Sequence, residues 1–123
     1  MRRVATHILS FIAGALLAAV LAFVVFSGRD STATVVLLND TLSPLTNVRV
    51  HNRETGGTLV VDHIAVGQSE TLRLHVRGEG SYVLSVNLPS VGLVKAERYM
   101  ETGYAITEHI GPEAIRADHS LYE

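Results

Sequence analysis

Three histidines stand at a constant spacing in the middle of the chain. His51, His63 and His75 follow one another at intervals of twelve residues. In a meander of three neighbouring strands, equal spacing can bring three side chains into one row across a sheet. Imidazole nitrogens in such a row bind zinc or copper(II). The spacing therefore predicts a histidine-based metal site, and the alternative is three solvated histidines that point outward.

The local pattern around His63 argues partly against this row. Apolar residues stand on both faces of the segment 58–66, and a register shift of one residue moves every side chain to the opposite face. A β-bulge at Asp62 and His63 would leave both of these side chains near the surface. It would turn four apolar residues inward together, namely Leu59, Val61, Ile64 and Val66.

Carboxylates near the end of the chain raise the question of an enzyme. Glu97, Glu101 and Glu108 fall on or between the last two predicted strands. Paired carboxylates hydrolyse glycosides, but one of them needs a cleft that raises its pKa, and a sandwich of this size seldom has one. The sequence also lacks the G-x-S-x-G, H-E-x-x-H and glycine-rich phosphate-binding motifs. We expect no enzyme, no catalytic residue and no cofactor.

Tyr99 and Tyr104 flank the turn "METG". If these tyrosines are exposed, they suit a protein contact, because tyrosine provides contact area at low entropic cost. The alternative is that they cover one end of the core with their hydroxyls in water.

The elements that position these residues begin after an apolar segment. Residues 8–26 form an uncharged run of 19 residues, which as a helix extends roughly 28 Å, close to the thickness of the bilayer core. The run is longer than the apolar part of most cleaved signal peptides. We therefore predict a retained transmembrane signal anchor, with a signal cleaved near residues 28–34 as the alternative.

The flanking charges predict the orientation of this segment. Arg2 and Arg3 precede it, whereas Arg29 and Asp30 cancel after it. Positive charge stays on the cytoplasmic side, so residues 1–7 are expected in the cytoplasm and the remainder in the periplasm or outside the cell. Small residues four apart would form one helix face suited to packing against another transmembrane helix. They are Ser10, Gly14, Ala18 and Ala22.

Composition narrows the range of partners. Residues 27–123 carry eight Arg or Lys and twelve Asp or Glu, and no basic cluster occurs among them. Nucleic acid is therefore not an expected partner. The chain has no cysteine, which excludes thiolate metal sites and disulfides. It has nine arginines and one lysine, and this ratio indicates a bacterial protein from a GC-rich genome.

Short β-branched runs separated by turn residues follow a polar spacer at 27–33. This spacing predicts an all-β domain over 34–110, a small antiparallel immunoglobulin-like β-sandwich of about seven strands. The tail 111–123 begins with Gly-Pro and would suit one or two helical turns, or a frayed end. The predicted strands are 34–39, 46–52, 58–66, 71–76, 81–88, 93–100 and 103–110.

Together these features predict a single-pass protein of the inner (plasma) membrane with a small exported domain. We expect a non-enzymatic binding or accessory module that docks on a protein partner in the envelope. The second hypothesis is an envelope protein that binds copper or zinc through its histidines. No small-molecule substrate is indicated.

Overall fold

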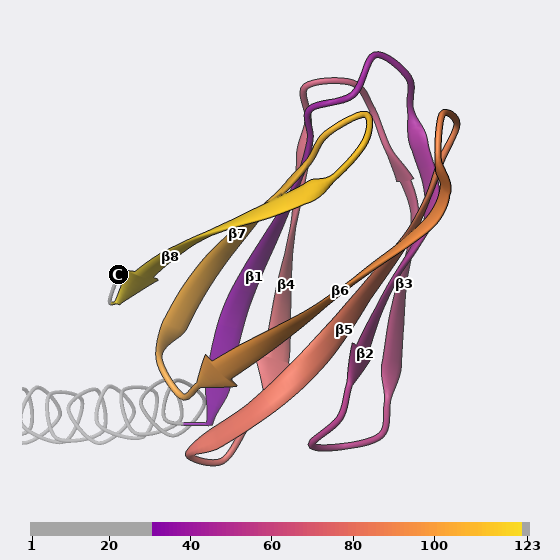
Figure 1. Cartoon of the computed structure of the whole chain (residues 1–123). Helices are drawn as coiled ribbons and strands as arrows, with labels where there is room; N and C mark the ends of the chain where they lie inside the picture. Colours follow the sequence, from indigo (N-terminus) through magenta and orange to yellow (C-terminus); the bar gives the residue numbers. More distant parts are fainter. Residues whose placement is uncertain (1–30, 122–123) are drawn as a thin grey trace, which may run out of the picture. The chain divides into compact units, whose positions relative to one another are not determined.

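The computed structural model describes residues 31–121 of the 123-residue chain, and these residues form eight β-strands in two four-stranded sheets (Figure 1). The prediction of an all-β sandwich is confirmed. Within the described range, no helix is long and apolar enough to cross a membrane. The predicted span 8–26, with its Ser10–Ala22 packing face, lies outside the described residues.

The chain passes repeatedly between the two sheets. The first sheet has the order β4-β1-β7-β8 and the second the order β3-β2-β5-β6. The strands of the first sheet are β4 (Ser69–His75), β1 (Thr32–Asn39), β7 (Tyr104–Ile110) and β8 (Ile115–Leu121). Those of the second are β3 (Thr58–Ile64), β2 (Leu45–Asn52), β5 (Glu79–Leu88) and β6 (Gly92–Glu101).

Strand β1 lies in the middle of its sheet rather than at an edge. It pairs antiparallel with β4 and parallel with β7, where Val35 is opposite Ile106. Val35 and Leu37 are fully buried, whereas Val36 and Leu38 on the other face are half-buried. The continuous apolar run of this strand thus follows from its central position, which leaves neither face fully in water.

The core lies between the sheets and follows the predicted alternation. On β5, Tyr82, Leu84, Val86 and Leu88 are all buried, as their period of two predicts. The largest fully buried side chains also include Leu37, Leu74, Met100, Ile106 and Ile110. Burial of these apolar side chains is the main force that holds the two sheets together.

An irregularity interrupts the pairing of β2 with β3. Asn47 has a positive φ of 54°, and the residues on either side of the break, Val48 opposite Val61 and Thr46 opposite His63, remain paired. The register is the same on both sides of this break, so no extra residue forms the β-bulge considered at Asp62 and His63. Both side chains are nevertheless exposed, and the flanking Val61 is buried. Ile64 is buried as well.

The inward positions predicted for Leu59 and Val66 are wrong. These side chains are 43% and 46% exposed. Leu59 lies on β3, an edge strand of the second sheet. Val66 follows the end of β3 and lies in the turn before β4.

The C-terminal tail corrects another expectation. Residues 115–121 form β8 rather than helical turns, which makes eight strands instead of seven. The turn closes with a hydrogen bond of 3.0 Å from the Gly111 amide to the Ala114 carbonyl. Ile115 and Ala117 pack partly buried against the core, while Arg116 and Asp118 are exposed. This alternation has the period of a strand, whereas the Gly-Pro start of the tail had indicated a helix start.

One end of the sandwich is held by a buried asparagine. Asn39, at the end of β1, donates from Nδ2 to the carbonyls of Ser43 and Ile64, at 2.9 Å each. Its Oδ1 accepts bonds from the amide and hydroxyl of Thr41. These bonds join β1, the loop to β2 and the end of β3, so they connect both sheets.

Candidate functional site

The structure does not bring the three predicted metal ligands into one row. His63 on β3 is paired with Thr46 on β2, and His51 lies five residues further along β2. Five residues of strand extend roughly 17 Å. His75 belongs to the other sheet, where it pairs with Thr32.

Each of these histidines has a separate environment. The Nδ1 of His51 lies 3.0 Å from the Thr58 hydroxyl, and the His75 carbonyl accepts a 2.8 Å bond from the buried Asn52. Among residues 31–121, no three histidine, aspartate or glutamate side chains are placed to hold a metal ion. The geometry therefore does not support a row of three ligands, and metal binding through these histidines stays a prediction.

A buried carboxylate connects the two sheets. Glu108 on β7 is fully buried and accepts bonds from the Tyr82 hydroxyl at 2.7 Å and from Arg98. Arg98 on β6 approaches both carboxylate oxygens, with Nε at 2.9 Å and Nη2 at 3.2 Å. The same Nη2 lies 3.4 Å from the Ile115 carbonyl of β8. We call Tyr82, Arg98 and Glu108 the buried bridge.

The electrostatics of the buried bridge follow from its position between the sheets. Burial, together with the charge of Glu108 and the bond to it, raises the pKa of Tyr82 above its ordinary value. The hydrogen bond to Glu108 raises the pKa of Arg98. Tyr82 and Glu108 have no exposed surface, so a ligand in solution does not reach them. The arrangement suits cohesion between the sheets rather than chemistry on a substrate.

The three carboxylates considered from the sequence lie apart from one another. Glu108 is inside the sandwich, while Glu97 is on the surface and pairs with Arg53 at 3.2 Å. Both partners of this surface pair are more than half exposed. Glu101 forms a hydrogen bond with the hydroxyl of Tyr99. No two of the three carboxylates share a hydrogen-bond partner.

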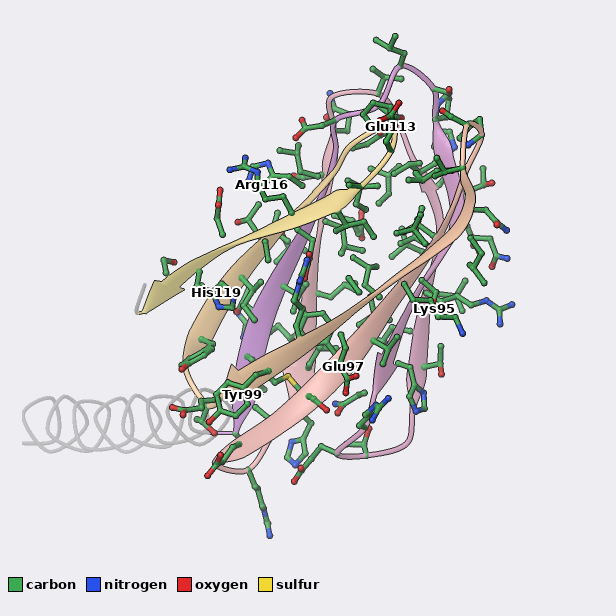
Figure 2. The ribbon with its side chains drawn as sticks, in the orientation of Figure 1. Lys95, Glu97, Tyr99, Glu113, Arg116 and His119 are labelled. Carbon is green, nitrogen blue, oxygen red and sulfur yellow. The ribbon has the colours of Figure 1, made fainter. Side chains whose placement is uncertain are left out.

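Tyr99 is 47% exposed and does not cover the core. Its hydroxyl lies between two carboxylates, Glu101 and, at 2.9 Å, Glu79. The hydrogen bond with Glu101 is the main cause that raises the pKa of Tyr99. The ring of Tyr104 packs edge-on against that of Tyr99, with centroids 6.1 Å apart. Figure 2 shows Lys95, Glu97 and Tyr99 in succession along β6.

One surface cluster has no signal in the sequence. His109 on β7 lies 3.1 Å from Asp40 through Nδ1 and 2.8 Å from Asp118 through Nε2. Arg116 is 3.5 Å from Asp118. Asp40 and His109 are 69 residues apart in the chain, and only the parallel pairing of β1 with β7 brings them together. The cluster ties the loop after β1 to β8.

No protein-family model matches this chain. No curated protein matches it either.

The edge of β3 presents two adjacent exposed apolar side chains. Leu59 and Val60 are 43% and 47% exposed. The Asn52 amide donates to the Gly57 carbonyl at 2.8 Å, so these two residues form a hydrogen-bonded pair. Bonded and non-bonded pairs alternate in an antiparallel ladder. Leu59 therefore bonds to β2, and the backbone N–H and C=O of Val60 point away from the sheet.

Proposed function

We propose that this chain is a membrane-anchored, non-enzymatic binding module that docks on a protein of the cell envelope. In this proposal residues 8–26 anchor the chain in the inner membrane, and an immunoglobulin-like sandwich faces the periplasm or the exterior. The edge of β3 accepts an extended segment of the partner as an additional strand. The observation that carries the proposal is the exposed and uncharged first half of β3.

The comparison among the four edge strands supports this choice. Natural sheets protect their edges from pairing with other chains by charged side chains. The segment 58–61 of β3 has none, and charge begins only at Asp62. Each of the other edge strands carries at least two charged side chains: Glu70 and Arg73 on β4, Lys95, Glu97, Arg98 and Glu101 on β6, and Arg116 and Asp118 on β8.

Strand addition at β3 would use two kinds of contact. The free N–H and C=O of Val60 would bond to the backbone of the partner segment, which provides affinity without a deep pocket. The exposed side chains of Leu59 and Val60 lie on opposite faces of the strand and would contact alternate side chains of the partner. A membrane anchor would raise the effective concentration for a partner in the same membrane, so a small contact area suffices.

Two substitutions at Val60 test this edge by different means. Val60→Pro removes the outward N–H without removing a bond to β2, and proline is tolerated at such edge positions. Val60→Lys keeps the backbone and adds an edge charge. Val60→Thr is the matched control, because it keeps both the branched shape and the N–H. Proteins recovered with each variant from solubilised membranes are then compared by quantitative mass spectrometry.

We expect one set of proteins to co-purify with the native chain and Val60→Thr and to be lost with Val60→Pro and Val60→Lys. Circular dichroism checks that each variant keeps its strands. If the blocking variants recover the same proteins as the native chain, β3 is not the docking edge. Gly14→Leu then tests the small-residue face of the anchor in the same assay. If the native chain recovers no partner, the binding-module proposal loses its support in favour of metal binding.

A further inference from the structure

The outer face of the second sheet is hollowed between β2, β5 and β6. The hollow has a volume of about 340 Å³, within the range of small-ligand sites. Five of the six side chains that line it are polar: Asn47, Arg49, Ser85, Asn87, Leu93 and Lys95. We call this feature the outer-face hollow.

The pairing register aligns the two cations of the hollow. Arg49 on β2 is opposite Ser85 on β5, and Ser85 is opposite Lys95 on β6. The three residues therefore form one row across the sheet. Neighbouring strands lie about 4.8 Å apart, so Arg49 and Lys95 start roughly 10 Å apart. Side chains of this length can reach a single group located above Ser85.

These two cations are unpaired in residues 31–121. Neither Arg49 nor Lys95 makes an ion pair or a side-chain hydrogen bond there. Arg53, in the turn that follows β2, instead pairs with Glu97 at 3.2 Å. Residues 27–123 carry more acidic than basic side chains, so two free cations in one hollow are a local exception. An anion bound between them would relieve their mutual repulsion.

The remaining residues of the hollow indicate what accompanies the anion. Asn47 and Asn87 offer amides and Ser85 a hydroxyl, and each group both donates and accepts hydrogen bonds. Sugar hydroxyls also donate and accept, whereas a simple anion only accepts. Leu93 is 59% exposed beside them and would contact the C–H face of a sugar ring. A hollow of this size suits a compact ligand better than an extended peptide.

We propose that the outer-face hollow binds an anionic saccharide. Its carboxylate or phosphate lies between Arg49 and Lys95, since guanidinium binds either group through two parallel bonds. Its hydroxyls bond to Asn47, Ser85 and Asn87. This site is on the face of the sheet, separate from the backbone edge of β3.

The test uses the full-length chain in a non-ionic detergent. Isothermal titration measures the binding of glucuronate and of glucose 6-phosphate. Glucose tests the need for charge, and acetate and inorganic phosphate test the need for the sugar. We expect at least one of the two charged sugars to bind more tightly than all three controls, and added salt to weaken this binding.

Substitutions then locate the binding site. Arg49→Gln and Lys95→Gln should each weaken binding of the charged sugar roughly tenfold to a hundredfold, the range for a lost hydrogen bond to a charged group. Arg53→Gln is the matched control, because it removes the same charge from the turn that follows β2, outside the hollow. It should change the affinity less than twofold.

Three outcomes would overturn the proposal. One is that neither charged sugar binds at millimolar concentration. Another is that acetate or inorganic phosphate binds as tightly as the charged sugars, which makes the hollow a simple anion site. The last is that Arg53→Gln weakens binding as much as Arg49→Gln, which places the sugar elsewhere. Circular dichroism of each variant excludes unfolding as the cause of a loss.

Discussion

Removal of Arg98 should destabilise the sandwich far more than removal of a surface arginine. Arg98 provides two of the three hydrogen bonds that Glu108 accepts, at 2.9 and 3.2 Å. In Arg98→Met, the fully buried carboxylate keeps only the bond from Tyr82. Water cannot replace the lost bonds without entering the core, so one carboxylate oxygen loses its hydrogen-bond partner.

The expected loss in the free energy of unfolding of Arg98→Met is a large part of the total stability. Breaking a buried ion pair by removing one partner costs about 3–5 kcal/mol. Arg98 is 23% exposed, which allows some water to approach and places the expected loss near the lower end. A domain of roughly ninety residues has a free energy of unfolding of about 5–14 kcal/mol. The variant should therefore unfold at a clearly lower urea concentration.

Urea unfolding of the fragment 31–123, followed by circular dichroism, measures this effect. The native fragment should itself give a β-type spectrum and one cooperative transition. Arg53→Met is the matched control, because its pair with Glu97 is more than half exposed on both sides. Such a pair contributes about 0–1 kcal/mol. The two variants lose the same charge and gain the same side chain.

A triple variant tests whether Arg98→Met loses stability because it leaves a buried carboxylate without its partner, or because it removes a polar side chain. Replacement of the whole buried bridge by Tyr82→Phe, Arg98→Met and Glu108→Met removes all three of its polar side chains together. Such replacements are often neutral, so stability should recover to within about 1 kcal/mol of the native value. The reasoning is refuted if Arg98→Met costs no more than Arg53→Met, or if the triple variant is less stable than Arg98→Met alone.

Three further predictions concern the anchor, the histidines and alkaline pH. Mass spectrometry of the native protein should show residues 8–26 still attached; a mature N-terminus between residues 28 and 34 would contradict the anchor. If the histidines bind metal, zinc or copper(II) added to the protein should shift the imidazole resonances of His51, His63 or His75, and a chain with no shifts would remove this alternative. The raised pKa of Tyr82 means that the folded state holds this proton more tightly. Its contribution to stability is therefore complete below about pH 10 and decreases by about 1.4 kcal/mol per pH unit above it. Tyr82→Phe should show a smaller decrease in urea unfolding across the same pH range.

Much of the fold was predictable because its signal is local. The period-two pattern of β5 identifies Tyr82 and Leu84 as core residues without any knowledge of their neighbours, since alternate side chains of a strand face opposite sides. The exposed pair Asp62–His63 was likewise predictable, because two polar residues between apolar ones require a break in alternation. The tail was misread because Pro112 is compatible with both a helix start and a turn.

The candidate sites depended on pairings that local pattern does not contain. The equal spacing of the histidines predicted a row, but His75 follows a crossing to the other sheet and leaves the meander. The outer-face hollow requires Arg49, Ser85 and Lys95 in register across three strands, and nothing in the sequence near any one of them indicates the others.

The sequence by itself determined the composition of the chain, the apolar segment at 8–26 and the series of short amphipathic strands. The composition is a property of the residues alone, and the other two features depend only on residues that are near one another in the chain. The tertiary structure alone decided that Glu108 is buried in contact with Tyr82 and Arg98 rather than exposed on the surface, and that Asp40 contacts His109. Glu108 and His109 both lie on β7, which is located between β1 and β8. That position is selected by the burial of the whole core, to which every strand contributes at once.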